Sequence, residues 1–379
     1  MNRISVKPRK DWREKVKEAG LLYHHTDEGL WWDESAYYEF STGEIDELEA
    51  ATEELHELCL AAVRHVIDRN RFEELSIPPE AVPVIRDSWR RDEPSLYGRF
   101  DFAYNGATPP KLLEYNADTP TSLLEASVVQ WFWLQELFPE ADQFNSIHER
   151  LEEGWQRFSL LKRGRGKLFF GCISDHLEDL TTITYLQDTA DSQGFATERI
   201  FMEDIGWDSA TRQFADLNNL PIRNMFKLYP WEWLIAERFG PFLLETYESM
   251  CWIEPIWKMI LSNKGILPIL WELNPGHPNL LEAYFDQRGG MKNYVRKPKL
   301  SREGANITLV RDGNEISTEG TYGQEGYICQ ALADIPNFDG NYPVLGSWII
   351  NGHSAGMGIR ETQGLITFKG DRFVPHLFV

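Results

Sequence analysis

The stretch YGRFDFAYNGATPPKLLEYN, residues 97–116, decides the fold because it reads as a strand, a loop and a second strand. In residues 99–104 and again in residues 111–116, polar side chains alternate with apolar ones, which is the period of a β-strand. An Asn-Gly pair and two prolines lie between the segments, so we predict a hairpin with a longer loop. The polar side chains that share one face of this hairpin are Arg99, Asp101, Glu114 and Asn116.

If these four side chains converge, they form a site of oxygen ligands with one guanidinium. Asp101, Glu114 and Asn116 offer two carboxylates and an amide oxygen, ligands that hold Mg²⁺ together with substrate phosphates. Arg99 suits a phosphoryl oxygen that gains charge during a reaction. A solvated strand face with an Arg–Asp ion pair would show the same alternation, so the pattern by itself leaves both interpretations open.

Two stretches outside the hairpin carry helix signals. Residues 44–70 follow a capping box, Ser41 with Glu44, and their apolar residues recur at three- and four-residue steps, as in an amphipathic core helix. A second box, Ser122 with Glu125, predicts the start of a buried helix whose apolar residues spread over several faces.

The middle of the chain alternates strand and helix, and its C-terminal part is rich in strands. Residues 167–174 and 197–203 are predicted strands that flank a helix over residues 178–193, a βαβ unit with parallel pairing. Residues 224–229 add one more strand. The later predicted strands are 294–299, 305–310, 327–332, 344–350 and 356–360, with an Asn-Gly turn between the last two. The expected fold class is a mixed α+β protein of several lobes.

Further cationic side chains could bind phosphate. Residues 297–306 combine two lysines, an arginine and a glycine in a strand and a small-residue turn, and such a turn can fold over a polyphosphate. Lys264 lies between apolar stretches, and Arg360 ends a glycine-spaced strand where a ligand could approach the backbone. Basic surface turns, snorkelling lysines and structural turn arginines explain the same patterns.

Composition narrows the classes of function. The chain has 379 residues with 38 Lys and Arg against 59 Asp and Glu, a net charge of −21, which argues against a general binder of nucleic acid or anionic membrane. Acidic surfaces favour cationic partners such as amines, although most such acids form a solvated face. No signal peptide and no apolar stretch long enough to cross a membrane is found, so we expect a soluble, cytoplasmic protein.

Several enzyme classes lack their motifs. No HExxH, G-x-S-x-G or Walker A sequence occurs. The four cysteines are widely spaced, which fits reduced thiols better than a disulfide framework. We interpret Trp231, Trp233, Trp252, Trp257 and Trp271 as core packing rather than as a platform for stacking bases.

In this order, the features resemble the synthetase domain of glutathionylspermidine synthase and its shorter bacterial relatives, the acid–amine ligases. The matching segments run over nearly the whole chain: YGRFDFAYNG, LLEYNADTPTSLLEA, FKLYPWEW, SNKGILPILWEL, VRKPKLSREGANI, YICQAL and GIRE. The resemblance implies an ATP-grasp-like fold, with residues 1–379 as a single synthetase domain with internal lobes and no amidase domain. It also implies a reaction in which ATP activates a carboxylate as an acyl phosphate, which an amine then attacks to give an amide.

The resemblance also implies roles for the polar residues of the hairpin. Arg99 would stabilise charge in the transition state. Asp101, Glu114 and Asn116 would hold Mg²⁺, with Glu114 bridging two ions. Arg360 would lie near the acyl phosphate as a second catalytic arginine.

The family pattern further implies a nucleotide site. Lys264 and Lys297 match the two nucleotide-binding lysines, and Gly304 lies in the loop that would cover the phosphates. Gln330 with Leu332 lies on the strand expected beside adenine. The arginines expected to complete this nucleotide site are Arg99, Arg302 and Arg360.

Two segments correspond to substrate-binding parts of the family. Residues 117–121 replace a serine-rich segment that binds the acid, which puts glutathione as the substrate in doubt and leaves Thr119 and Thr121 as expected contacts. Glu178 and Asp179 stand roughly where acidic residues bind polyamine, so we expect an amine pocket.

The expected function is an ATP- and Mg²⁺-dependent ligase that joins a carboxylate, peptide-like in the family, to an amine or polyamine. Its expected partners are these small molecules, with no nucleic acid and no membrane. The alternative from another class is a non-catalytic sensor that binds nucleotide or polyamine without turnover.

Overall fold

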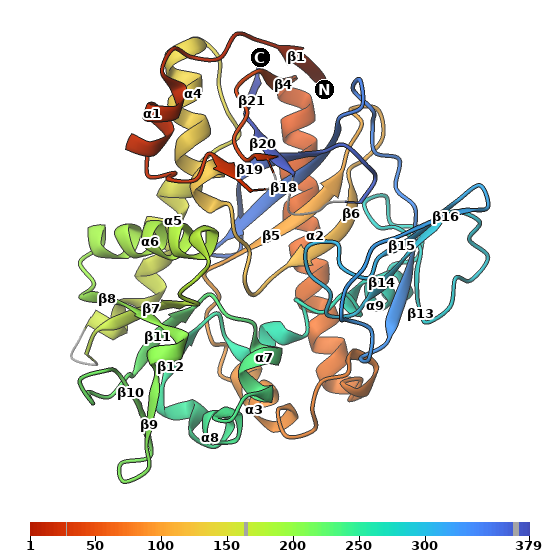
Figure 1. Cartoon of the computed structure of the whole chain (residues 1–379). Helices are drawn as coiled ribbons and strands as arrows, with labels where there is room; N and C mark the ends of the chain where they lie inside the picture. The colour runs from red at the N-terminus through yellow and green to blue at the C-terminus, as the bar shows by residue number, and fades with distance from the viewer. Residues whose placement is uncertain (28, 163–165, 367–370) are drawn as a thin grey trace.

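The centre of the molecule is a five-stranded antiparallel sheet (Figure 1). The computed structural model describes residues 1–27, 29–162, 166–366 and 371–379. The strands of this sheet, in spatial order, are β20 (Arg372–Val374), β19 (His353–Thr362), β18 (Tyr342–Ile350), β5 (Tyr97–Ala103) and β6 (Lys111–Asn116). The predicted hairpin of residues 97–116 therefore forms one edge of the central sheet.

The register of β5 and β6 places their polar residues opposite one another. Arg99 pairs with Asn116 and Asp101 pairs with Glu114, and an irregularity follows Asp101. Phe100 lies on the other face, fully buried. The predicted alternation is confirmed for β5 and for Glu114–Asn116, and the four polar side chains share one face; at the irregularity it is wrong, because Leu112 rather than Leu113 is buried.

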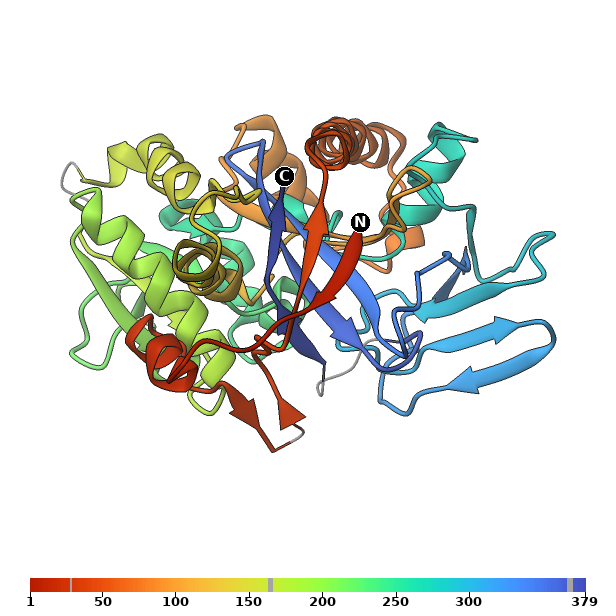
Figure 2. The ribbon, with the colours of Figure 1, turned by 90° about the horizontal axis from the view of Figure 1, so that it is seen from above.

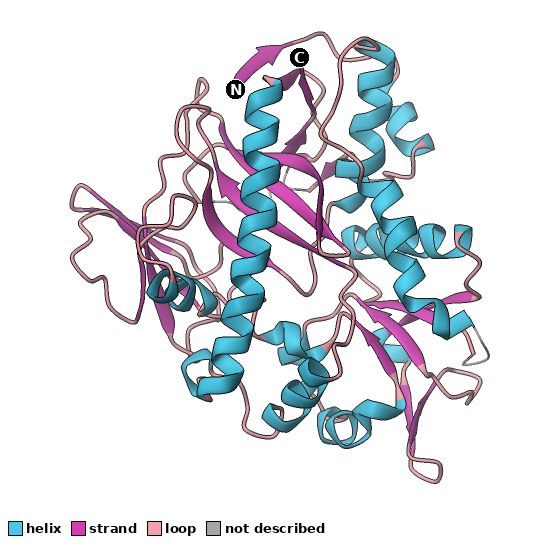
Figure 3. Ribbon diagram, turned by 180° about the vertical axis from the view of Figure 1, so that it is seen from behind, coloured by secondary structure: helices cyan, strands magenta, loops and turns pink. Residues whose placement is uncertain are grey.

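One long helix covers the face of the central sheet that lies opposite the four polar side chains. Figure 3 shows α2 (Thr42–Arg69) crossing the sheet from behind. The Ser41 hydroxyl accepts a hydrogen bond from the Glu44 backbone N–H, and the Ser41 backbone N–H donates one to the Glu44 carboxylate, so the predicted capping box is confirmed. In the packed interface the Thr52 and Ser347 hydroxyls lie 2.7 Å apart, so a hydrogen bond joins the helix to β18.

A parallel sheet forms a second lobe. Its strands, in spatial order, are β12 (Cys251–Ile253), β11 (Asn224–Lys227), β7 (Leu168–Cys172) and β8 (Thr197–Phe201). The helix α6 (Leu177–Ser192) connects β7 to β8, and the two strands pair in parallel. The predicted βαβ unit is thus confirmed. The residues at the carboxyl ends of β11 and β12 contact the segments next to the β5–β6 hairpin, as described below.

A second antiparallel sheet lies on the other flank of the central sheet (Figure 2). Its strands, in spatial order, are β13 (Ala283–Phe285), β17 (Tyr327–Ala331), β14 (Tyr294–Pro298), β15 (Thr308–Arg311) and β16 (Asn314–Ser317). The strand expected over residues 305–310 begins later, at Thr308, because the chain turns through positive φ at Gly304 and Asn306.

Smaller elements complete the described chain. A three-stranded sheet of β1 (Asn2–Ser5), β4 (Ala36–Phe40) and β21 (His376–Phe378) brings the two ends of the chain together (Figure 1). Two strand pairs are β2 (His25–Thr26) with β3 (Gly29–Leu30) and β9 (Gly206–Asp208) with β10 (Gln213–Ala215). Further helices are α1 (Trp12–Glu18), α3 (Val82–Arg90), α4 (Gln130–Leu137), α5 (Ile147–Trp155), α7 (Trp231–Ala236), α8 (Gly240–Thr246) and α9 (Ile266–Leu273). Among the described residues, no helix combines the length and the apolar character that crossing a membrane requires.

The second predicted capping box, Ser122 with Glu125, is wrong. Ser122 has φ 66° and its hydroxyl donates to Glu178 Oε1, 3.2 Å away. Glu125 is only 2% exposed, and its Oε1 accepts from Trp31 Nε1 at 2.7 Å. The carboxylate is enclosed by the N-terminal segment, so it cannot cap the helix, which begins here with a π-helical turn over Glu125–Val129 before α4.

The tryptophans divide between core and surface. Trp231, Trp252 and Trp257 are buried, as predicted. Trp233 is 39% exposed, and the guanidinium of Arg302 lies 5.7 Å from its ring centroid. Trp271 is partly buried and packs against the same core. The prediction of core packing is therefore wrong for Trp233, whose aromatic ring lies beside an expected phosphate-binding arginine.

Candidate active site

The polar face of the β5–β6 hairpin is a connected network. Arg99 donates to both oxygens of Asp101, at 2.7 and 3.1 Å, and its third nitrogen donates to the Thr121 carbonyl at 2.8 Å. The Asn116 amide donates to Asp101 Oδ2 at 3.1 Å and to Glu114 Oε1 at 3.4 Å. The structure therefore brings the four residues of the predicted set into direct contact with one another.

Glu114 connects the hairpin to the loop before α9. Its Oε2 lies 2.9 Å from Lys264 Nζ, which also donates to the Ser301 carbonyl at 2.6 Å. Burial alone would raise the pKa of Glu114, but the charges of Lys264 and Lys297 hold that pKa well below its ordinary value. The carboxylate is thus kept ionised while 27% of its side chain remains exposed, as a metal ligand requires.

Lys297 on β14 lies behind the hairpin. Its ammonium donates to Gln330 Oε1 at 2.7 Å and to the Leu113 carbonyl at 3.0 Å, and Gln330 in turn donates to the Leu112 carbonyl. Burial lowers the pKa of Lys297 to about 8. Leu332 lies one residue beyond β17, where its N–H donates to the Asn293 carbonyl.

Arg302 reaches across from the loop between β14 and β15. Its guanidinium donates to Thr119 Oγ1 at 2.8 Å and to Glu232 Oε1 at 2.9 Å. Gly304 follows at φ 70°, a conformation that favours glycine. The loop is therefore joined to residues 117–121, the segment expected to bind the acid.

Arg360 lies on β19 of the central sheet, separated from Arg99 on β5 by the strand β18. A small cavity between β5, β18 and β19 is bordered by Arg99, Asp101, Ser122 and Arg360. Gly346 also lines it, and a Cβ at this position would come within 2.7 Å of the Arg99 side chain, so only glycine leaves that arginine its place. The two expected catalytic arginines thus line one cavity.

The expected amine-binding residues lie at the N-terminus of α6. Glu178 is held by Ser122 at 3.2 Å, and burial raises the pKa of its carboxyl group. Asp179 points elsewhere, since its Oδ1 is 3.0 Å from His176 Nδ1. Glu178 therefore contacts Ser122, which also lines the cavity of Arg99 and Arg360, whereas Asp179 contacts His176 at the start of its own helix.

The oxygen ligands form a small set. Among the described residues no group of three or more His, Cys, Asp or Glu side chains is arranged to hold a metal ion. Asp101, Glu114 and Asn116 contribute only two carboxylates and an amide, the number that Mg²⁺ uses when phosphates and water complete its shell. The donor chemistry therefore fits a magnesium ion that arrives with a nucleotide.

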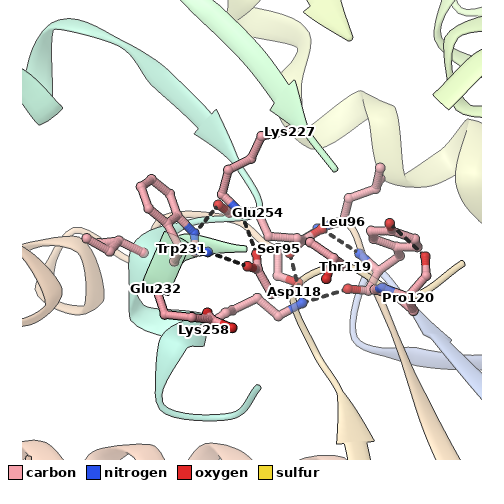
Figure 4. Close-up of polar contacts among 12 residues, drawn as sticks. Ser95, Leu96, Asp118, Thr119, Pro120, Lys227, Trp231, Glu232, Glu254 and Lys258 are labelled. Carbon is pink, nitrogen blue, oxygen red and sulfur yellow. Dashed lines mark hydrogen bonds and ion pairs between the residues drawn. The ribbon is translucent and has the colours of Figure 1, made fainter. Parts of the chain in front are cut away.

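Two buried ion pairs beside the site were not predicted from the sequence. Figure 4 shows Asp118 with Lys227, 2.6 Å apart, and Glu254 with Lys258, 2.8 Å apart. Trp231 connects them, because its backbone N–H donates to Asp118 and its indole donates to the Glu254 carbonyl. A lysine at the end of an apolar strand, as in the segment FKLYPWEW, is the signal that could have identified the first pair.

A family model for the glutathionylspermidine synthase preATP-grasp region matches residues 3–379. The chain belongs to this glutathionylspermidine synthase family. A Haemophilus influenzae protein named "Putative acid--amine ligase" is 40% identical over the full length of both chains.

Two longer members of the glutathionylspermidine synthase family are more distant. Trypanothione synthetase of Crithidia fasciculata is 29% identical over 83% of this chain, and the bifunctional glutathionylspermidine synthetase/amidase of Escherichia coli is 28% identical over 90%. The alignments cover 52% and 59% of those proteins, so this chain spans little more than half their length.

A solved structure shares the fold. A glutathione synthetase-like effector of Globodera pallida, in its apo form, matches with a TM-score of 0.59 over 97% of this chain and 96% of that chain. The identity is 11%, so the likeness concerns the fold alone. It agrees with the mixed helix and sheet arrangement described above.

The buried carboxyl group of Glu125 predicts a pH-dependent stability. Burial raises the pKa of its carboxyl group from 4.5 to about 7. The folded chain therefore holds this proton more tightly than the unfolded chain, and stability is lost as the pH rises through 4.5 to 7. We expect the free energy of unfolding of the wild type to fall by about 2.5 kcal/mol relative to Glu125→Gln between pH 5 and pH 8. Denaturant unfolding of both proteins at the two pH values measures this; parallel behaviour would contradict it.

Proposed function

We propose that this protein is an ATP- and Mg²⁺-dependent carboxylate–amine ligase that forms an amide through an acyl phosphate, on an ATP-grasp-like domain spanning residues 1–379. The observation that carries the proposal is the β5–β6 network, in which Asp101 contacts Arg99 and Glu114 contacts Lys264. Such alternation of carboxylates and cations matches a magnesium triphosphate, which carries both signs of charge. The β5–β6 network therefore provides local cationic side chains in a chain whose net charge is −21.

Asp101, Glu114 and Asn116 are the residues that would hold magnesium, with Glu114 between two ions. Bound there, the metal would neutralise charge on the phosphates of the nucleotide. Asn116 Nδ2 is within hydrogen-bond distance of both carboxylates, so the three side chains already share one location. Lys264 would then be released from Glu114 to the phosphates.

The nucleotide would lie between the central sheet and the β13–β17 sheet. Lys264 and Lys297 approach the hairpin from that flank, and the turn at Gly304 would cover the phosphates. Gln330 and the backbone of Leu332 stand at the end of β17, beside the expected adenine. Their contacts to β6 and to Asn293 fix this edge without help from a ligand.

The acid would bind near Thr119 and Thr121, with its carboxylate directed at the γ-phosphate. One carboxylate oxygen attacks the γ-phosphorus, the bond from that phosphorus to the β,γ-bridging oxygen breaks, and ADP leaves. Arg99 and Arg360, which line one cavity, would stabilise the negative charge on the transferred group. Arg302, held at Thr119, would be close to the same phosphate.

The amine would be drawn to Glu178 and Asp179. Its neutral nitrogen attacks the acyl carbon, and inorganic phosphate leaves with the oxygen that came from the acid. The raised pKa of Glu178 makes this carboxylate a suitable acceptor for the proton that the amine loses. The acidic surface would add a long-range attraction for cationic amines.

Phosphate release from ATP, measured across a panel of acids and amines with mass spectrometry of the products, tests the proposal. We expect release that requires one acid and one amine together, with formation of their amide. Nucleotide binding without turnover under every pairing would instead identify a sensor. Peptide acids with mono-, di- and polyamines are the first pairs to include. The proposed acid site contains the cationic Arg302, and the proposed amine site contains the carboxylates of Glu178 and Asp179.

A further inference from the structure

The Asp118–Lys227 ion pair is completely buried at the border between two lobes. Asp118 follows β6 and Lys227 ends β11, so the pair joins the central sheet to the parallel sheet. Their side chains are 2.6 Å apart and both are 0% exposed. The second carboxylate oxygen of Asp118 accepts the Trp231 backbone N–H at 3.1 Å, and the Lys227 ammonium lies 4.5 Å from the centroid of the Trp231 ring.

The two residues that hold Arg302 are chain neighbours of Asp118 and of Trp231. Thr119 follows Asp118 directly, and Glu232 follows Trp231 directly (Figure 4). These are the two residues to which the Arg302 guanidinium donates. One partner of Arg302 is thus the next residue after Asp118, and the other is the next residue after Trp231, which donates to Asp118.

Stability alone does not explain a pair of this kind. Removing two charges from water is costly, and replacing a buried ion pair with apolar side chains of similar volume is often neutral or stabilising. Burial also raises the pKa of Asp118 and lowers that of Lys227, so burial disfavours the charged form of both side chains. The other effect of the pair is to hold the residues beside it in one geometry.

We propose that Asp118 and Lys227 are positioning residues: they hold Thr119 and Glu232 in the arrangement that presents Arg302 to the phosphates of ATP. The inference rests on the proposed nucleotide site but adds a role for two residues that never touch the nucleotide. We assign no such role to Glu254 and Lys258, because their side chains contact Ser95, Leu96 and Tyr97 at the start of β5, and Glu254 contacts Trp231 only through its backbone carbonyl.

A double-mutant cycle on ATP affinity tests the proposal. The pair replacement Asp118→Asn/Lys227→Met removes both charges at similar volume and is compared with Arg302→Gln and with the combination of all three changes. Affinity for Mg²⁺-ATP is measured by calorimetry, without acid or amine. We expect the pair replacement to weaken binding about tenfold and to add at most about twofold once Arg302 is gone, because coupled residues are not additive.

Losses that multiply would overturn the proposal, since a merely structural pair weakens binding whether or not Arg302 is present. The matched control is Arg9→Met/Glu34→Gln, another buried ion pair, 2.6 Å apart, whose side chains contact Trp32 and Glu136 rather than the partners of Arg302; its ATP affinity should equal that of the wild type. If the pair replacement does not fold, Asp118→Asn/Lys227→Gln, which also removes both charges but can keep a hydrogen bond between the two side chains, takes its place in the same cycle.

The outcomes also separate this inference from the ligase itself. Wild-type protein that binds ATP but makes no amide with any acid and amine removes the proposed reaction, and the cycle still decides the role of the pair. Wild-type protein that does not bind ATP overturns both.

Discussion

Replacement of Asp101 or Glu114 with alanine should abolish ATP turnover while the fold remains intact. Each change removes one of two carboxylates from a set with a single further oxygen ligand, so magnesium would lose its protein anchor. Losing one preorganised charge contact at a transition state lowers kcat about 10²–10³-fold, and losing the metal as well should put turnover below detection. Phosphate release with saturating ATP, acid and amine measures the effect.

The controls for this prediction must separate chemistry from folding. Asp101 is 3% exposed, so Asp101→Asn, which keeps its shape, is tested beside the alanine variant. Glu315→Ala, an exposed carboxylate on β16, should retain wild-type turnover. Normal turnover in a folded Glu114→Ala protein would refute the metal assignment.

Lys258→Met should destabilise the chain more than any change at the surface. The Lys258 ammonium contacts Glu254 Oε2 at 2.8 Å, Ser95 Oγ at 2.7 Å and the Tyr97 carbonyl at 2.6 Å, all in the interior shown in Figure 4. Removing one partner of a buried ion pair leaves the other charge uncompensated, at a cost of about 3–5 kcal/mol. Urea unfolding at neutral pH gives the change in the free energy of unfolding.

Two further variants show whether the uncompensated charge is the cause. Lys258→Met/Glu254→Gln removes both charges and should recover part of the lost stability, because Gln still accepts from the Leu96 and Tyr97 N–H groups. Lys167→Met removes an exposed lysine paired with Glu198 and should change little. A loss for Lys258→Met no larger than that for Lys167→Met would show that the pair contributes nothing.

The hairpin could be predicted from the sequence because its order is local. A period of two residues assigns the side chains of residues 99–104 and 114–116 to a face, and packing of Phe100 and Phe102 then fixes which face is inside; the irregularity that buries Leu112 was not predicted. The long helix α2 followed from the same kind of evidence, a capping box and a repeating apolar stripe.

The contacts between lobes could not be predicted in this way. Arg302 binds Glu232, and Asp118 binds Lys227, across more than 60 residues of chain, and no local period describes such a pairing. The Ser122–Glu125 capping box failed for the same reason: the N-terminal Trp31 supplies the donor that a helix N-terminus would otherwise supply. Composition and spacing therefore could not predict which residues form contacts between distant parts of the chain.

The most direct test of the ligase follows an oxygen atom. The acid identified by the substrate panel is labelled with ¹⁸O in its carboxylate and converted to amide with ATP and the amine, and the phosphorus products are analysed by mass spectrometry. Transfer through an acyl phosphate predicts ADP, with one labelled oxygen in inorganic phosphate. Label in AMP, or unlabelled phosphate beside the amide, would contradict the account.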